Sequence, residues 1–455
     1  MRSSVSKPTP NGEAAIDAAE VDGGIVFFPA GLYRCADLLT VSASGVVIRG
    51  EGPALSRVYF TRFEGPEGIR HLTFAGKTVG GTERLLVADG QPRDITVAVE
   101  DATGLAPGDD VAVGHVITDE FVAEHGMTGT WQVFNGKWQV LARREVVAVD
   151  TSADPHLVTL DVPLRSPLLL RDNASLRPDG GYLSEVGVEH LGLANAIAWD
   201  DAWSNERIHV LSLRRCKDAW VRDVASFPSP AAPTEGPGAG AHLQSGGIHV
   251  AEAKRVTVTD CVMEEVQNRG GGGCGYLFEI QISNEILTTG CVGRHGRHNF
   301  IQNFGFGVSG CVWSKCLSEQ GEAINIPEYP EFVMTGYSEF HHSLATANLI
   351  EDCVFHDGWK AVNRGAESSG AGHTATEDVF WNLSGSGLLV SRQWSTGYVI
   401  GTAPELEVIT ALDDGPFSEE ASGTEPEDWV EGVGVGAWLE PASLYEDQLA
   451  RRLSH

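Results

Sequence analysis

Cysteine is scarce in this sequence, and no stretch is apolar over enough residues to span a bilayer. Eight cysteines in 455 residues are too few for a disulfide scaffold, and no CxxC pair or Cys/His spacing typical of a zinc site occurs. The first twenty residues lack the apolar segment of a signal peptide. We therefore expect no membrane partner, and either a cytoplasmic protein or a secreted one whose leader has been removed.

Lysine and positive charge are also in short supply. Only 7 of the 32 basic residues are lysine, against 62 acidic residues, and the formal net charge is −30. A protein that binds duplex nucleic acid needs a broad positive surface, so this balance argues against a nucleic-acid partner. It still permits an anionic substrate, because a local cluster of arginine and histidine can override the overall charge.

Long amphipathic helices are nearly absent, and short β-rich segments dominate from about residue 185 onward. Six of them share one template, in which an apolar alternation ends on a small or apolar residue. These ends are Val224, Cys261, Cys291, Cys316, Cys353 and Leu383, at separations of 37, 30, 25, 37 and 30 residues. Strand-like units at such spacings predict a solenoid of β-coils. Equivalent residues of neighbouring coils stack about 4.8 Å apart, so the four template cysteines are expected to form an inward-facing column.

Two N-terminal segments carry a resemblance to a known family. AAIDAAEVDGGIVFFPAGLYR (14–34) and GVVIRGEG (45–52) resemble the cap and first coils of the pectin-lyase-like superfamily. The resemblance implies a right-handed parallel β-helix, and most enzymes of this architecture act on long carbohydrates. The predicted fold class is therefore all-β: a single-stranded right-handed parallel β-helix with a small inserted β-module and short capping helices.

The expected organisation has four parts. Residues near 95–165 alternate like the strands of a small antiparallel module, and residues 404–449 carry thirteen Asp or Glu and no Lys or Arg. Helices over 12–20 and 441–453 are expected to close the first and last coils. We expect an N-terminal cap with the first coils over 1–94, the module over 95–170, the main β-helix with site loops over 171–403, and an acidic cap over 404–455.

Inserts between the coils hold the unusual chemistry. A spacing of 25 residues is near one bare coil, so longer spacings imply inserts, and inserts in solenoids gather on one face that is commonly the binding face. Counting from the template ends places Glu264, Arg294, Glu319 and His356 in one column. The same count puts Arg297 beside Glu322, and His298 in a column with Asn268 and Lys360. Two interpretations stay open: an ionic ladder that satisfies itself, or a working site.

Six of the fifteen histidines fall within these segments, and histidine suits proton transfer because it titrates near neutral pH. The predicted catalytic residues are Arg297, His298, Glu322, His341, His342 and Lys360. The predicted substrate-binding residues are Arg269, Glu279, Arg294, His295, Asp357, Arg364 and His373. Four tryptophans in polar contexts are expected either to pack in the core or to stack on sugar rings; they are Trp131, Trp138, Trp359 and Trp394.

The residue types leave three functions open. β-Elimination at a uronic acid needs a base and cations for the substrate carboxylate, and the arginine and histidine content favours this chemistry. A glycoside hydrolase or transglycosidase would use two carboxyl groups across the scissile bond. A non-catalytic glycan-binding β-helix is the third. We expect a carbohydrate partner and a possible homo-oligomer. No metal ligand or certain cofactor is predicted, although Ca²⁺ is possible among the acidic residues.

Overall fold

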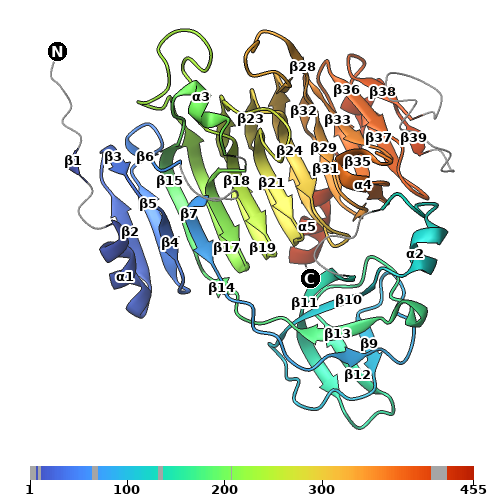
Figure 1. Ribbon diagram of the computed structural model, residues 1–455. Coiled ribbons are helices and arrows are strands. Elements are labelled where there is room, and N and C mark those ends of the chain that lie inside the picture. The colour runs from blue at the N-terminus through green and yellow to red at the C-terminus, as the bar shows by residue number, and fades with distance from the viewer. Residues whose placement is uncertain are drawn as a thin grey trace.

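The computed structural model describes residues 7–8, 12–63, 70–131, 137–205, 207–410 and 428–454. They form a long stack of parallel strands, with a small antiparallel module packed against one side of it (Figure 1). The predicted all-β, right-handed parallel β-helix is confirmed. None of the helices in the described residues combines the length and the apolar composition that a bilayer crossing requires.

Three series of parallel strands build the faces of the β-helix. The first pairs in the order β2 (Gly24–Phe28), β5 (Val46–Gly50), β15 (Gly187–Ala194), β17 (Cys216–Ser226), β19 (Lys254–Thr259), β22 (Asn284–Thr289), β25 (Val312–Ser314), β31 (Leu349–Glu351), β35 (Val379–Leu383), β37 (Tyr398–Thr402) and β39 (Trp429–Glu431). The second contains β1 (Lys7–Pro8), β3 (Gly31–Cys35), β6 (Ser56–Phe60), the later halves of β15 and β17, β20 (Val262–Glu264), β23 (Val292–Arg294), β26 (Leu317–Glu319) and β32 (Val354–Phe355). β14 (Leu183–Ser184) pairs with the start of β17.

The third series is a ten-stranded sheet. Its order is β4 (Leu39–Val41), β7 (Arg70–Ala75), β16 (His209–Arg214), β18 (Gly246–Ala251), β21 (Tyr276–Gln281), β24 (His298–Asn303), β29 (Ser338–Phe340), β33 (Gly358–Ala361), β36 (Leu388–Ser391) and β38 (Glu407–Ile409). Because side chains alternate along a strand, this sheet sends one set into the core and the other out to solvent. The outward set is where the polar residues gather.

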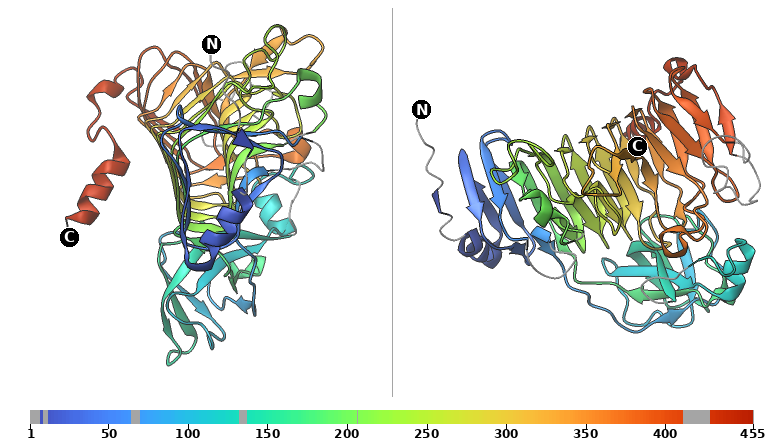
Figure 2. Two further views of the ribbon diagram at one scale, coloured as in Figure 1. Left: turned by 90° about the vertical axis from the view of Figure 1, so that its left-hand side faces the viewer. Right: turned by 45° about the horizontal axis from the view of Figure 1, so that its top comes forward.

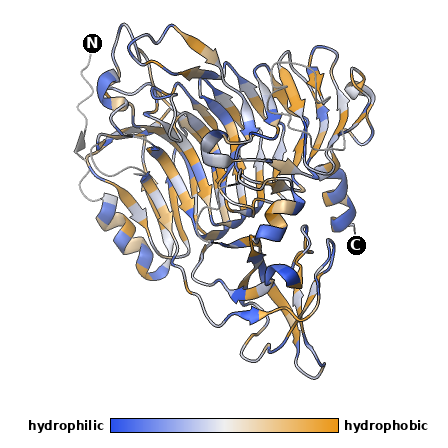
Figure 3. Cartoon of the chain, turned by 45° about the vertical axis from the view of Figure 1, so that its right-hand side comes forward, coloured by the Kyte–Doolittle hydropathy of each residue, from blue (hydrophilic) through white to orange (hydrophobic). Residues whose placement is uncertain are grey.

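The core runs the length of the stack between the three faces. Each coil contributes inward apolar side chains, and the strands in Figure 3 are accordingly banded between hydrophobic and hydrophilic residues. The template ends all belong to this core: Val224, Cys261, Cys291, Cys316, Cys353 and Leu383. The four cysteines are free and buried, and the backbone N–H of Cys316 lies 3.4 Å from Sγ of Cys353 in the next coil. The predicted inward-facing cysteine column is confirmed.

The antiparallel module has six strands and a core of its own. They are β8 (Arg84–Leu85), β9 (Thr96–Val99), β10 (Asp110–Val116), β11 (Trp138–Asp150), β12 (His156–Leu160) and β13 (Ser175–Pro178). Helix α2 (Asp119–Glu124) lies between β10 and β11. The module core also takes in Phe306 and Leu344 from the β-helix. Lys254 of β19 reaches Asp110 of the module at 2.7 Å, so the module is anchored to the coils.

Four further helices accompany the coils. α1 (Gly12–Asp22) packs against the first coils, as expected for residues 12–20, and α3 (Trp199–Ala202) and α4 (Glu367–Gly370) are single turns in insert loops. The helix expected over 441–453 forms as α5 (Leu444–Leu453). It lies beside the stack (Figure 2) rather than over the last coil, because Glu351 of β31 accepts a hydrogen bond from the backbone N–H of Tyr445 at 3.0 Å. The four predicted domain boundaries stay a prediction.

Candidate functional site

The outward face of the ten-stranded sheet holds a cavity of about 520 Å³ over β21, β24, β29 and β33. On these strands Phe278, Phe300, Phe340 and Trp359 point into the core. Their neighbours Glu339, His341 and Lys360 therefore point outward. These three line the cavity together with Tyr276 and His298, the first residues of β21 and β24, the glycines at 271–273, loop residues around 323–337, and the turn at 368–369.

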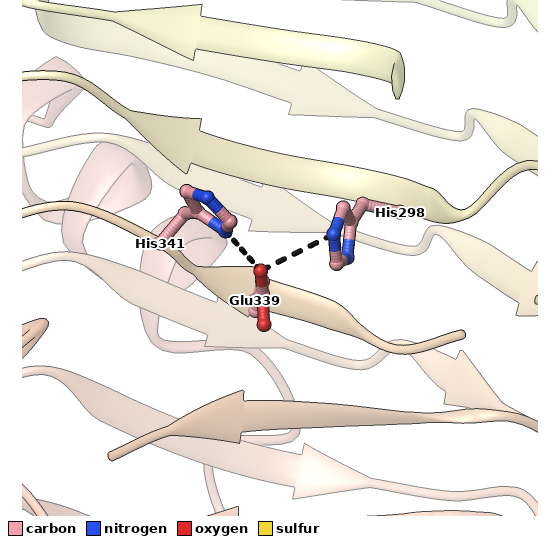
Figure 4. A group of neighbouring side chains, drawn as sticks. All are labelled: His298, Glu339 and His341. Carbon is pink, nitrogen blue, oxygen red and sulfur yellow. Dashed lines mark hydrogen bonds and ion pairs between the residues drawn. The ribbon is translucent and has the colours of Figure 1, made fainter. Parts of the chain in front are cut away.

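His298, Glu339 and His341 form the centre of this cavity (Figure 4). Both imidazoles approach the same carboxylate oxygen of Glu339. His298 Nε2 lies 3.3 Å from Glu339 Oε1, and His341 Nδ1 forms a short hydrogen bond with that atom. Glu339 and His341 lie two residues apart in sequence, whereas His298 comes from the preceding rung on β24. The fold, and not sequence proximity, brings His298 to this carboxylate.

Hydrogen bonds assign the protons on the two imidazoles. His298 donates from Nδ1 to the carbonyl oxygen of Tyr337 at 2.6 Å, so its Nε2 carries the lone pair. Nδ1 of His341 contacts the Glu339 carboxylate and lies 2.8 Å from a guanidinium nitrogen of Arg364. Because an ionised carboxylate only accepts, the proton is assigned to Nδ1 and the lone pair to Nε2. Such a partner fixes the tautomer and orientation of an imidazole. Both rings are thereby set to present a basic nitrogen.

Burial and neighbouring charges keep the two imidazoles neutral. Burial, with the charge of Arg364, lowers the pKa of His341 to about 3. Burial also holds the pKa of His298 well below its ordinary value, against the opposing effect of Glu339. For Glu339 burial acts to raise the pKa, but Arg364 and the two imidazoles outweigh it and hold the pKa well below its ordinary value. At neutral pH the centre is one carboxylate and two neutral bases.

Four cationic side chains line the same cavity: Arg207, Arg297, Lys360 and Arg364. Arg364 donates to Glu339 Oε1 at 2.6 Å and to Ser368 Oγ at 3.0 Å. Arg297 donates from Nε to His298 Nε2 at 3.0 Å. Among the lining residues that the structure describes, Glu339 is the only carboxylate. The cavity is thus electropositive within a strongly acidic protein.

His298, Glu339 and His341 are also the one group in the described chain that offers three metal-ligating atoms within 4.8 Å of one another. Two nitrogens and one oxygen do not match Ca²⁺, which prefers six to eight oxygen ligands. Arg364 already donates to the Glu339 oxygen that both imidazoles face. Its charge thus takes the position that a cation bound to that oxygen would need, so the geometry favours a hydrogen-bonded acid–base centre.

Six of the predicted site residues meet in this cavity. They are Arg297, His298, His341, His342, Lys360 and Arg364. His342 donates from Nε2 to the carbonyl oxygen of Ser368 at 2.7 Å. The Lys360 ammonium lies 4.8 Å from the centre of the Tyr337 ring. Their roles in binding or catalysis remain predictions, but the structure brings them together.

Four other predicted site residues form ion pairs outside the cavity lining. Arg294 lies between Glu264 at 3.3 Å and Glu319 on neighbouring rungs, which confirms the predicted column for these three of its four members. Glu322 pairs with Arg269 and lies 3.9 Å from His295, instead of pairing with Arg297 as expected. These pairs correspond to the self-satisfying ladder interpretation.

The last three predicted site residues are buried elsewhere. Glu279 lies 2.9 Å from Nε2 of buried His209. Asp357 accepts hydrogen bonds from Asn299 and Ser318, both at 2.9 Å. His373 packs at the junction with the module, where its ring centre is 4.9 Å from that of Trp394. Their substrate-binding roles stay predictions.

Sequence analysis did not select several residues that line the cavity. These are Arg207, Tyr276, Asn303, Tyr337 and Glu339. A signal for Glu339 exists, because residues two apart on a strand share a face and Glu339 stands two before His341. For Arg207 and Tyr276 no such signal exists, since they come from other coils.

The predicted seventh-position column is wrong. His298 pairs with Tyr276, and Lys360 pairs with Glu339. The chain bends at His295 with a φ of 52°, and the loops that follow the equivalent bends differ in length. Counting along the sequence therefore loses the register after the corner.

No protein-family model and no curated protein matches this sequence, but solved structures do. The Gp54 tailspike of Acinetobacter baumannii bacteriophage AP22, in complex with A. baumannii capsular saccharide, matches with a TM-score of 0.50 and 9% identity, covering 94% of this chain and 66% of its own. The gp49 tailspike of Pseudomonas phage LKA1 has a TM-score of 0.42 and 14% identity, and the match covers 87% of this chain and 68% of the tailspike. The gp61 tailspike of Pseudomonas phage phi297 has a TM-score of 0.41 and 12% identity, and the match covers 88% of this chain and 67% of the tailspike.

This chain thus spans about two thirds of the length of these tailspikes. The likeness to the AP22 tailspike concerns the fold. The chain has a right-handed parallel β-helix fold, as this tailspike does.

Proposed function

We propose that this protein cleaves an acidic polysaccharide or oligosaccharide by β-elimination at a uronic acid residue. The observation that carries the proposal is the composition of the cavity: four cations and three imidazoles surround a single carboxylate among the described lining residues. A pocket of this charge attracts an anionic ligand even in a protein of net charge −30. That the AP22 tailspike, which shares the fold, was solved with a capsular saccharide supports a glycan as the ligand.

Two features of the cavity support β-elimination: a neutral imidazole that can accept a proton and cations that can bind a carboxylate. In our proposal His341 accepts the C5 proton of the uronate, because its tautomer is fixed by Glu339 and its ring is neutral. Arg297 and Lys360 bind the substrate carboxylate and stabilise the charge that develops on it when the proton leaves. The electrons of the C5–H bond form a C4–C5 double bond, and the C4–O bond breaks with its electrons on the oxygen. The departing oxygen takes a proton from water, and His341 then gives up its proton to solvent.

The same composition disfavours a glycoside hydrolase. Hydrolysis by the common mechanisms needs two carboxyl groups flanking the bond. Glu339 is the single carboxylate in the described lining, and its Oε1 already accepts hydrogen bonds from Arg364 and His341. The other carboxylates among the predicted site residues, Glu279, Glu322 and Asp357, lie outside the lining. The imidazoles and cations of the cavity therefore favour a lyase, which does not need a pair of carboxyl groups.

The test is absorbance at about 235 nm, where an unsaturated uronate absorbs, over a panel of uronate-containing glycans. Lyase action raises this absorbance with the wild-type chain. His341→Ala and Arg297→Ala are each expected to lower kcat/KM by about 10²–10⁴-fold, with an unfolding midpoint close to that of the wild type. New reducing ends without the absorbance would identify a hydrolase. Glycan binding without any product would identify a binding protein.

Two matched substitutions control for general effects. His190→Ala removes a half-exposed histidine that pairs with Asp223, and Arg222→Ala removes an arginine that pairs with Glu189. Neither residue lines the cavity. Both variants are expected to keep wild-type turnover. Equal losses in the control and cavity variants would contradict the assigned roles.

A further inference from the structure

A second cavity of about 370 Å³ lies on the same face of the ten-stranded sheet, towards the N-terminal coils. Strands β7, β16, β18 and β21 form its floor, and β11 of the antiparallel module forms a wall. The lining includes Arg70, Trp138, Arg214, His249, Glu252 and Gln281. Neither the predicted site residues nor the proposed catalytic centre accounts for this cavity.

The strand register places the two cavities along one line. His249 pairs with Glu279, Glu279 with Ile301, and Ile301 with Glu339. His249 is therefore three rungs from Glu339, about 14 Å at about 4.8 Å per rung. Arg207 lines both cavities. The two hollows thus adjoin along the axis of the stack, at a separation that a short oligosaccharide spans and a single sugar ring does not.

Cations are concentrated in the second cavity as they are in the first. Burial lowers the pKa of Arg70, and the neighbouring charges of Arg207 and Arg214 add to that effect while Glu279 and Glu252 oppose it. Such gathering of like charges costs free energy unless an anion compensates it. Glu252 compensates part of it through Arg214 at 2.7 Å. Arg207 lies 4.0 Å from Glu279, and the described lining of the cavity contains four arginines beside one carboxylate, Glu252.

The floor of this cavity is built to hold Arg70 in place. His249 donates from Nε2 to the side-chain oxygen of Gln281 at 2.8 Å, so its Nδ1 is an acceptor. This Nδ1 accepts hydrogen bonds from Ser212 Oγ at 2.9 Å and from Arg70 Nε at 3.3 Å. Burial keeps the pKa of His249 well below its ordinary value, so the ring stays a neutral acceptor. Buried polar side chains thus position a cation beside an open hollow.

We infer that this second cavity binds a further acidic group of the same glycan chain. The inference rests on the proposed function and sharpens its substrate class: a polyanion that carries acid groups on at least two residues and lies along the axis of the coils. The shared chemistry is an oxyanion, either a uronate carboxylate or a sulfate ester. The module contributes to binding, because Trp138 of β11 lines this cavity.

The test measures equilibrium binding by calorimetry on the full chain. The probes are oligogalacturonates, alginate oligomers and hyaluronan oligomers, each from dimers to octamers. Wild-type affinity is expected to rise about tenfold with length in at least one series, as a further charge-assisted contact forms. The variant Arg70→Gln/Arg214→Gln is expected to lose that rise and to bind dimers like the wild type. Partially sulfated, uronate-free oligomers separate sulfate from carboxylate recognition.

Arg222→Gln is the matched control. The Arg222 side chain is 49% exposed and pairs with Glu189 at 2.8 Å, as Arg214 is 53% exposed and pairs with Glu252, but it lines neither cavity. It should keep the length dependence. Should the double variant unfold, Arg214→Gln alone carries the same test. Unchanged length dependence in the variants, or its absence in the wild type, overturns the inference.

Failure of the proposed function is distinguishable from failure of this inference. If length-dependent binding is lost in the double variant while no product absorbs at about 235 nm, the second site stands and the lyase proposal falls. If product forms and the double variant treats long and short oligomers as the wild type does, the lyase proposal stands and the second site falls.

Discussion

Glu339 contacts three ionisable side chains at the centre of the cavity, those of Arg364, His341 and His298. Its oxygen accepts from Arg364 and His341 and faces His298. The side chain is only 3% exposed, so these interactions are weakly screened by solvent. In the proposed reaction Glu339 touches no substrate atom. It is a positioning residue that orients His341 and balances the charge of Arg364.

Replacing Glu339 by glutamine tests this positioning role. Glutamine keeps the shape and an acceptor oxygen but removes the charge, so we expect kcat to fall by about 10² while KM changes little, because Arg297 and Lys360 remain. Glu339→Asp should restore part of kcat. Steady-state kinetics on the best substrate of the panel measure the split. Glu189→Gln, a buried carboxylate outside the cavity, serves as control, and an effect on KM alone would contradict the role.

The pH profile offers a second test at this scale. The proton acceptor must be neutral, and the pKa of His341 is lowered to about 3. The value of kcat/KM reports groups of the free enzyme, so it should stay flat as the pH falls from about 7 to about 5. Initial rates in overlapping buffers measure this. An acid limb near the ordinary histidine pKa would show that a different group accepts the proton.

At the scale of elements, a repeated left-handed bend shapes the coils. The residue before each template end has a positive φ: 50° at Asp223, 55° at Asp260, 65° at Gly290, 55° at Lys315, 48° at Asp352 and 52° at Asn382. Each bend turns the chain from the first strand series to the second and points the following side chain into the core. The cysteine column is a consequence of this repeated corner.

Gly290→Ala tests the cost of that corner. A side chain in the left-handed region is strained by about 1–2 kcal/mol, and a Cβ at Gly290 would lie 2.7 Å from Oδ1 of Asp260 in the neighbouring coil. We expect the free energy of unfolding to fall by at least that amount in denaturant titrations. Gly80→Ala, where a Cβ meets nothing within 4 Å, should be close to neutral. Equal stability of the two variants would refute the argument.

Counting residues along the sequence predicts which side chains of neighbouring coils are paired only as far as the next bend. The column of Glu264, Arg294 and Glu319 was predictable because each follows its template end by three residues within one continuous strand. Beyond the next bend, loops of unequal length precede β24 and β33. His298 therefore stands beside Tyr276 instead of Lys360. Within a strand, backbone hydrogen bonds fix which residues of neighbouring coils are paired, whereas a loop of variable length does not fix the pairing of the strand that follows it.

At the scale of the whole molecule, buried neutral histidines are spread from the first coils to the module. Burial lowers the pKa of His71, of His242 and of His373 to about 4 in each case. His71 lies in β7, whereas His373 accompanies His125 at the junction between coils and module. The unfolded chain binds protons at these residues at a higher pH than the folded chain does.

This distribution predicts destabilisation by acid. Because the folded pKa is lowered, the stabilising contribution is present above about pH 6.5 and is lost as the pH falls towards about 4. At about pH 5 each such histidine lowers the free energy of unfolding by about 1–2 kcal/mol relative to its value at neutral pH. The unfolding midpoint should therefore drop steeply between these limits. Thermal unfolding at a series of pH values measures it.

His71→Gln isolates one contribution. His71 donates from Nε2 to the carbonyl oxygen of Arg62, and a glutamine amide supplies a donor without a titrating proton. The variant should show a shallower loss of stability with acid, whatever its stability at neutral pH. His190→Gln, at a half-exposed position, should keep the wild-type slope. A variant slope equal to that of the wild type would rule out His71 as a contributor.

The amino-acid sequence by itself determined the β-helix, its inward cysteine column and the concentration of arginine and histidine between residues 294 and 373, since local alternation, repeat spacing and composition carry that information. It also supplied both members of the Glu339–His341 pair, two positions apart on one strand. Only the tertiary structure decided that His298 reaches the same carboxylate, that Glu322 and Asp357 are occupied elsewhere, and that the module walls a second cationic cavity. Those outcomes depend on loop lengths and on the docking of separate coils, which no local pattern encodes.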